Sequence, residues 1–247
     1  MNIAILLAGG VGNRLGAGKP KQFVELLGKP MIVYAMEIYE NSPIIDAIEV
    51  VCVAEYIDYV WELAQQYNIK KLKWVCAGGS SCQEFTRNGI FNLENELSPD
   101  DMLTVNMSSS IFVSEEILQD SFRVAKKYGS AFACMQCIYN NAETTDGISS
   151  NKINFKEQNR TINMPWTASM GKLSKMYHKA YEEGIETGET AYMPTLFLAL
   201  GEPIYFSMDD GLNKIHVTRQ ADVEIASAVL EYRQNHKNER KSGREKR

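Results

Sequence analysis

The 247-residue sequence lacks the features by which membrane and exported proteins are recognised. No stretch approaches the ~20 uninterrupted apolar residues that cross a bilayer, and the N-terminus has neither the basic start nor the long apolar core of a signal peptide. An excess of basic charge is also missing, because 26 Lys and Arg face 31 Asp and Glu, for a net charge of −5. We therefore expect a cytoplasmic protein with no membrane partner and no nucleic-acid partner.

Cysteine is scarce as well, and its pattern argues against disulfides and zinc. The chain has an odd number of cysteines, mostly in apolar segments: Cys52, Cys76, Cys82, Cys134 and Cys137. The last two form a C-x-x-C pair, but no second C-x-x-C or H-x-x-H pair exists to complete a zinc site. A redox pair normally opens a helix, whereas residues 131–135 have the pattern of a strand. We expect reduced, structural thiols.

The remaining composition is that of an ordinary globular protein. Hydrophobic residues make up 45% of the chain, and its length allows one large α/β domain to bury most of its apolar surface. We expect this single domain over residues 1–234. Residues 235–247 are polar and mostly charged, with no apolar side chain to bury, so we expect a disordered basic tail. Contact of the tail with a membrane or RNA is a minor alternative.

The most informative stretch lies near the N-terminus, where an apolar run leads into closely spaced glycines. Residues 3–7 have the pattern of a buried parallel strand, and Gly9, Gly10 and Gly12 follow directly. Glycine lets backbone N–H groups approach an anion, and Arg14 and Lys21 add positive charge. The stretch therefore predicts a phosphate-binding loop. The alternative is a tight strand-to-helix turn with two solvated basic residues.

The glycine spacing excludes two common nucleotide-binding motifs. The dinucleotide fingerprint G-x-G-x-x-G fails because Leu15 stands at its third glycine. The Walker pattern G-x-x-x-x-G-K-[ST] fails because Ala17 and Gly18 follow Gly16. The pattern that remains is A-G-G-x-G-x-R, followed by P-K-Q at residues 20–22.

Strands and helices alternate in the first part of the chain. The periodicity predicts strands at residues 48–53, 72–75 and 101–105, and helices at 30–39, 55–67 and 83–97. This alternation predicts a parallel sheet with right-handed crossovers. Ligands of such sheets bind beyond the carboxyl ends of the strands, so the first loop and Gly78-Gly79-Ser80-Ser81 can share a site.

The second part contains a long polar excursion. Residues 140–163 carry only a weak hairpin signal around Asp146-Gly147, and an excursion of this length is typical of a binding or dimerisation arm. Around it we expect a helix at 113–127 capped by Ser114, strands at 131–139 and 204–208, and helices at 173–184, 192–200 and 221–234.

These motifs resemble those of one enzyme family. Residues 7–16 (LAGGVGNRLG), 20–23 (PKQF) and 28–31 (GKPM) are similar to the opening of the 2-C-methyl-D-erythritol 4-phosphate and ribitol-5-phosphate cytidylyltransferases. Gly78-Gly79 with Gln83, Asn88 and Gly89 resembles their second glycine segment, and residues 215–218 (IHVT) their closing I-K-V-T. The resemblance extends to about Tyr232. It implies an α/β fold, a Rossmann-like nucleotidyltransferase in three layers with a projecting β-arm that pairs two subunits into a homodimer.

The resemblance also implies an activity and a site. Such enzymes transfer CMP from CTP to a polyol phosphate and release pyrophosphate, and charge that builds on the phosphate oxygens must be met by positioned cations and N–H donors. By resemblance, Arg14 and Lys21 are catalytic. The implied nucleotide-binding residues are Ala8, Gly9, Gly10, Gly12, Gly79 and Ser80. The implied acceptor-binding residues are Arg160, Thr145 and His216. Arg160 has the alternative of a surface arginine, and His216 that of a satisfied structural histidine.

Several family positions are changed in this chain. Residues 106–111 (NMSSSI) replace the family's H-D-A-A-R-P, so Met107 stands at the aspartate that helps to hold Mg²⁺, and methionine does not bind a hard cation. Cys82 replaces an arginine and Phe85 a serine near the nucleotide. Asp209 can still hold the magnesium that the resemblance implies, or form a solvated turn with Asp210. These changes leave open a diverged acceptor, another nucleoside triphosphate, or a catalytically silent nucleotide-binding protein.

Overall fold

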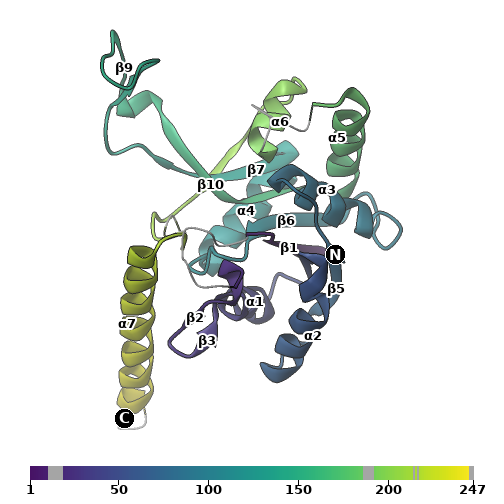
Figure 1. The fold of residues 1–247 in the computed structure, drawn as a ribbon, viewed down its shortest axis with the longest axis vertical. Helices are drawn as coiled ribbons and strands as arrows, with labels where there is room; N and C mark the ends of the chain where they lie inside the picture. The colour runs from purple at the N-terminus through teal and green to yellow at the C-terminus, as the bar shows by residue number, and fades with distance from the viewer. Residues whose placement is uncertain (11–18, 186–191, 214, 216, 245–247) are drawn as a thin grey trace.

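The computed structural model of the chain describes residues 1–10, 19–185, 192–213, 215 and 217–244. Within these residues, seven strands form one mixed sheet in the order β11-β7-β10-β6-β1-β4-β5 (Figure 1). Strand β1 pairs in parallel with both β4 and β6, and β4 with β5, which confirms the parallel sheet predicted for the first part of the chain. The strands are β1 (Asn2–Ala8), β4 (Ala47–Cys52), β5 (Leu72–Ala77), β6 (Met102–Met107), β7 (Ser130–Gln136), β10 (Arg160–Ser169) and β11 (Phe206–Met208).

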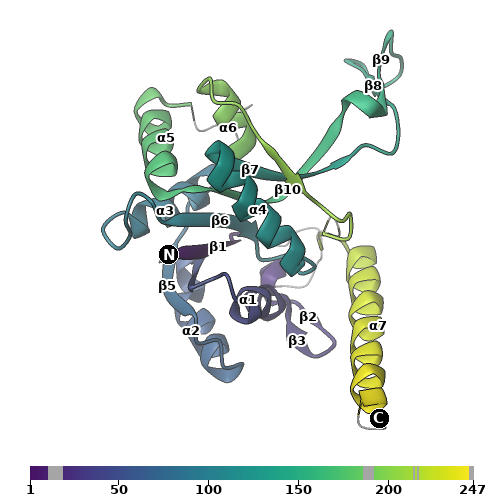
Figure 2. The same cartoon turned by 180° about the vertical axis from the view of Figure 1, so that it is seen from behind.

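Helices cover both faces of this sheet, so the domain has three layers (Figures 1 and 2). Alternate residues of β1 point to opposite faces, as strand geometry requires. One core contains Ala4 and Leu6 together with α1 (Met31–Asn41), α2 (Ile57–Gln66) and α4 (Glu115–Tyr128). The other contains Ile3 and Ile5 together with α3 (Cys82–Leu93), α5 (Met170–Glu183) and α6 (Met193–Ala199). The fold is the predicted α/β, Rossmann-like nucleotidyltransferase sandwich.

Local signals place the helices close to where the sequence predicts them. Helix α4 starts after Ser114, whose hydroxyl accepts a hydrogen bond from the N–H of Ile117 at 3.3 Å, and it ends at Gly129 with φ of 91°. A side-chain N-cap and a left-handed glycine satisfy backbone groups that the helix ends leave unpaired. The five cysteines are free thiols, as expected.

Strand β10 was not predicted. It runs antiparallel between β6 and β7 and extends well beyond the expected polar excursion. Pro165 lies within it, and proline argues against a central strand because it cannot donate to the ladder. In the structure this proline falls where the register shifts between Ile162 and Trp166, so the ladder accommodates it.

Two segments project from the body. The arm is a hairpin of β8 (Asn141–Glu143) and β9 (Lys152–Asn154) that extends away from the sheet, while α7 (Gln220–Arg244) projects at the other end (Figure 1). Helix α7 continues through residues 235–244, where the sequence predicts a disordered tail. Lys, Glu and Arg are good helix formers, and no proline interrupts them. A short ribbon of β2 (Glu25–Leu26) and β3 (Lys29–Pro30) precedes α1.

None of the helices that the structure describes is long and apolar enough to span a bilayer.

Candidate functional site

The carboxyl ends of four parallel strands meet at one edge of the sheet. Ala8 lies beside Cys52 in the register of β1 and β4, and Cys52 lies beside Ala77 of β5. The N–H of Gly78 donates to the carbonyl of Cys52 at 2.8 Å. On the other side of β1, the N–H of Ser108 donates to the carbonyl of Leu7 at 3.0 Å. We call residues 8–10 the first glycine segment and residues 78–80 the second. The structure brings both to this edge, together with residues 108–110.

The P-K-Q triplet is held against the end of β1. Gln22 is fully buried, and its Nε2 donates to the carbonyl of Ala8 at 2.6 Å. Lys21 lies directly against Gly10, because a Cβ added at Gly10 would stand only 2.5 Å from the Lys21 Cε. Glycine at this position therefore lets the lysine side chain cross the first glycine segment. Gln22 is a residue whose bracing role sequence reasoning missed; its place in the triplet was the available signal.

Helix α3 fixes the second glycine segment. The backbone N–H of Ser80 and its hydroxyl both donate to the Glu84 carboxylate, the hydroxyl at 2.7 Å, and these bonds hold the pKa of Glu84 below its usual range. Ser81 caps the helix by accepting from the N–H of Glu84, and Asn88 donates to the carbonyl of Ala77 at 3.3 Å. The two donors of Ser80 are thus engaged within the protein. The S-x-x-E spacing of Ser81 and Glu84 is the sequence signal of a capping box.

Met107 lines a cavity of about 410 Å³ between the end of β6, strand β10 and the start of α6. The indole Nε1 of Trp166 donates to the carbonyl of Asn163 at 2.9 Å, and the Asn163 amide donates to Asp209 at 3.0 Å. These bonds fix the β10 wall of the cavity. Its described lining consists of Met107, Ser110, Ile162, Asn163, Met164, Trp166, Tyr192, Pro194 and Thr195.

The described residues do not fit a protein-held magnesium site. Two hydrogen bonds fix the Asp209 carboxylate, one from Asn163 and the other from the N–H of Gly211 at 2.9 Å. The thioether of Met107 is a poor ligand for a hard cation. Within the described ranges, no group of three or more His, Cys, Asp or Glu side chains is arranged to hold a metal ion.

Two further predicted residues, Thr145 and Arg160, lie in the arm and at its base rather than beside the glycine segments. Thr145 follows β8 at the tip of the arm, and Arg160 lies where the arm rejoins the sheet (Figure 1). The Arg160 guanidinium donates to the carbonyls of Asn159 at 3.0 Å and Glu157 at 3.3 Å. Gly12, Arg14 and His216 lie outside the described residues.

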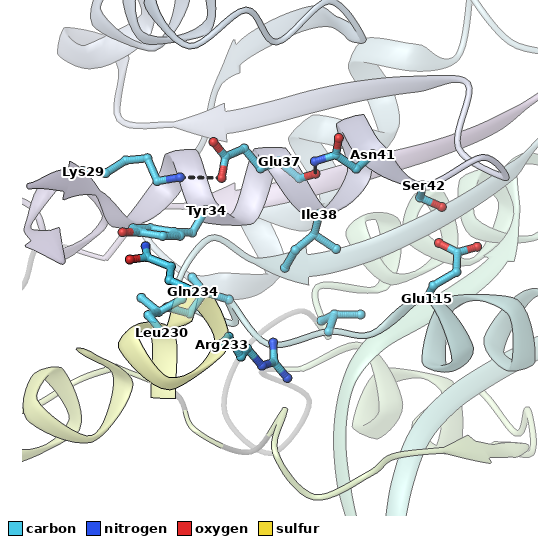
Figure 3. Close-up of a pocket in the computed structure, with 12 residues that line it drawn as sticks. Lys29, Tyr34, Glu37, Ile38, Asn41, Ser42, Glu115, Leu230, Arg233 and Gln234 are labelled. Atoms are coloured by element: carbon cyan, nitrogen blue, oxygen red, sulfur yellow. Dashed lines mark hydrogen bonds and ion pairs between the residues drawn. The ribbon is translucent and has the colours of Figure 1, made fainter. Parts of the chain in front are cut away.

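A second hollow, of about 360 Å³, lies between α1 and α7 (Figure 3). In this groove Lys29 pairs with Glu37 at 2.5 Å and also lies over the ring of Tyr34, 4.0 Å from its centroid. Leu230 and Arg233 of α7 form the opposite wall (Figure 3). Its lining includes no residue of either glycine segment, so the groove is separate from the candidate site.

Sequence comparisons match nearly the whole chain to one family of enzymes. The family model described as "2-C-methyl-D-erythritol 4-phosphate cytidylyltransferase" matches residues 2–232. The chain is 32% identical over 234 residues to the ribitol-5-phosphate cytidylyltransferase of Lacticaseibacillus paracasei, covering 93% of this chain and 98% of that protein. It is 27% identical over 233 residues to the 2-C-methyl-D-erythritol 4-phosphate cytidylyltransferase of Clostridium acetobutylicum, covering 93% and 97%.

A solved structure has the same fold. The crystal structure of the 4-diphosphocytidyl-2C-methyl-D-erythritol synthase from Anaerococcus prevotii superposes with a TM-score of 0.76. The match covers 94% of this chain and 98% of that one, at 18% sequence identity.

Proposed function

The chain belongs to the 2-C-methyl-D-erythritol 4-phosphate cytidylyltransferase family, and from this premise we propose that it transfers CMP from CTP to a polyol phosphate and releases pyrophosphate. It is an enzyme of the nucleotidyltransferase type. Two of its relatives are named for ribitol 5-phosphate and 2-C-methyl-D-erythritol 4-phosphate, which are both phosphates of sugar alcohols.

One observation carries the proposal: the two glycine segments converge at the carboxyl edge of the sheet, and Lys21 lies against the first of them. In α/β sheets this edge is where ligands bind. A lysine across a glycine-rich segment supplies a compact positive charge beside backbone N–H groups, an arrangement suited to phosphate oxygens.

The proposed reaction needs mainly positioning and charge. An oxygen of the acceptor phosphate attacks the α-phosphorus of CTP, one P–O bond forms, and the bond to the β-phosphate oxygen breaks as pyrophosphate leaves. Lys21 would meet the charge on the α-phosphate, and Arg14 the leaving phosphates. Gly9, Gly10 and Gly12 would line the phosphates, with the second glycine segment on the side of the base.

Ribitol 5-phosphate is the first acceptor that we propose, because the relative named for it is the more similar at 32% identity against 27%. Met107 and Ser110, both in the changed segment 106–111, line the β6–β10 cavity, and this supports a site that has diverged from that of relatives. Magnesium is expected by resemblance alone, and the described residues offer it no site.

The arm supports a homodimer. Ile148 is 92% exposed in the loop at the tip of the hairpin and Phe155 57% exposed at its base, and Ile138, Tyr139 and Ile153 are also exposed along the arm. Exposed apolar patches of this kind mark protein–protein contacts. Because the arm extends away from its own sheet, Thr145 and Arg160 would meet an acceptor only in a neighbouring chain.

Mass spectrometry of the products tests the proposal. Incubation with CTP, ribitol 5-phosphate and magnesium should yield CDP-ribitol and pyrophosphate in equal amounts. The second candidate, a catalytically silent nucleotide-binding protein, is favoured by Met107. Two results together would support this second candidate. Calorimetry would give the same affinity for CTP with and without magnesium, and no polyol phosphate would yield a product.

A further inference from the structure

Phe85 lies beneath the candidate nucleotide site, in the first turn of α3. Its ring is 6% exposed and belongs to the core on the α3 face of the sheet, with Ile5, Leu7 and Val51. A phenylalanine has no polar atom with which to hold a ligand, so any part that it plays in the site must come from packing.

The tip of this ring touches both glycine segments. A Cβ added at Gly9 would stand 2.6 Å from the Cε1 and Cε2 atoms of Phe85, and one added at Gly78 would stand 2.5 Å from its Cζ. Real Cβ atoms essentially never come this close to another heavy atom, so neither position accepts a side chain while the ring is in place.

The two segments belong to strands that are not neighbours. Strand β4 separates β1 from β5, which places these two strands roughly 10 Å apart across the sheet. Beyond the strand ends the segments come closer, because a Cβ added at either Gly9 or Gly78 would lie within 2.5 Å of the same Phe85 atom, Cζ. The ring of Phe85 reaches both at the end of β4. It therefore links, by direct packing, two backbones that the hydrogen-bond ladder connects only through a third strand.

We propose that Phe85 is a positioning residue that sets the separation of the two glycine segments and thereby the width of the nucleotide site. This inference rests on the proposed function, because it takes both segments to contact CTP. Gly9 and Gly78 are glycines because the ring occupies the space of their side chains, whereas Gly10 and Gly79 face Lys21 and Glu84 instead.

A double-mutant cycle tests the inference. Gly9→Ala should lower kcat/KM for CTP by about 100-fold, because a displacement of about 1 Å in a site can cost that factor. Adding Phe85→Ala should restore at least about 10-fold of the loss by making room for the new methyl group. Gly78→Ala should be rescued in the same way. Phe85→Leu replaces Phe85→Ala if the smaller side chain prevents folding.

The matched control is Gly79→Ala, whose methyl group would meet Glu84 rather than the ring. Phe85→Ala should leave its defect unrescued. Calorimetric Kd values for CTP and thermal unfolding accompany each variant. Rescue of both CTP affinity and kcat/KM at Gly9 and Gly78, and not at Gly79, is the expected result.

Losses that add without rescue would overturn the inference, as would a Phe85→Ala variant that loses stability but keeps the CTP affinity of the parent. If the parent chain itself binds no CTP, the proposed function has failed. The inference about spacing is then tested by Tm alone. It holds if adding Phe85→Ala reverses the decrease in Tm caused by Gly9→Ala but not the decrease caused by Gly79→Ala. Any other result overturns it.

Discussion

At the scale of single residues, Lys21 is the described side chain on which the proposed chemistry most depends. Its aliphatic stem packs against Gly10, so the side chain lies along the first glycine segment at the edge of the sheet. An interaction that is stronger in the transition state than in the ground state raises kcat rather than binding.

Lys21→Ala should therefore lower kcat by about 100-fold or more, which is the cost of removing one donor that stabilises developing charge. The KM for CTP should change far less. Steady-state pyrophosphate release measures both constants, and Lys19→Ala, at an exposed lysine two residues away, is the control. A Lys21→Ala variant that turns over CTP as fast as the parent would remove the basis of the mechanism.

Glu49 is a buried carboxyl group of β4, the strand next to the edge strand β5, and it faces α3. Its Oε1 accepts from the Asn92 amide at 2.8 Å and contacts the Cys76 thiol at 3.6 Å, while its Oε2 has no hydrogen-bond partner. Burial raises the pKa of Glu49 from 4.5 to about 8, against the opposing effect of those hydrogen bonds. Desolvation disfavours the charged form, so the folded protein holds this proton at neutral pH.

A folded-state pKa above the unfolded one makes stability fall as pH rises. Below about pH 4.5 Glu49 is protonated in both the folded and the unfolded state, and its contribution to the free energy of unfolding is fully present. Between about pH 4.5 and 8 only the folded state holds the proton, so this contribution is lost, by up to about 1.4 kcal/mol for each pH unit. Glu49→Gln should remove this slope, whereas the exposed Glu55→Gln should keep it. Denaturant unfolding at several pH values checks this; parallel curves for parent and Glu49→Gln would contradict it.

The sequence predicted residues whose chemistry is local and missed those whose contacts are distant. Glycines after an apolar strand and a nearby lysine indicate a phosphate site without knowledge of the fold. Phe85 reads as one more apolar residue of α3, because its two contacts come from strands that are distant in the chain. The partners of Glu49 were hidden for the same reason.

At the scale of elements, the hydrophobic periodicity of the sequence predicted the parallel strands and the capped helices, but it did not predict β10 or the full length of α7. The parallel β1-β4-β5 unit and the capped α4 are predictable because period, caps and crossovers agree. Strand β10 was missed because its proline and its polar start resemble a loop. Helix α7 continues where the loss of apolar residues suggested disorder, since helix formation along a charged surface needs no core.

The arm gives the prediction that belongs to this scale. Ile148→Ser combined with Phe155→Ser should convert a dimer into monomers, because these are two exposed apolar side chains of the arm that a partner would bury. Sedimentation equilibrium measures the mass. Tyr232→Ser, which removes a 62% exposed aromatic residue from α7, should leave the dimer intact. A parent chain that is monomeric, or a double variant that remains dimeric, would contradict the arm interface.

At the scale of the whole molecule, the fold is set by the packing of the three layers, whereas the choice of acceptor is set by a few side chains at the site. A three-layer sandwich with a TM-score of 0.76 to a solved structure at 18% identity shows that the packing pattern tolerates extensive substitution. Met107, which stands where the family resemblance places an aspartate, ends β6 within this unchanged fold. Family motifs therefore predict the reaction class and leave the acceptor to experiment.

Pyrophosphate release tests the central claim most directly. Each of the four nucleoside triphosphates is incubated in magnesium with ribitol 5-phosphate, 2-C-methyl-D-erythritol 4-phosphate or glycerol phosphates. We predict release with CTP and a sugar-alcohol phosphate, and none when either is omitted. Release with another nucleotide in place of CTP, or no release across the panel from a chain that still binds nucleotide, would contradict the assignment of a cytidylyltransferase activity.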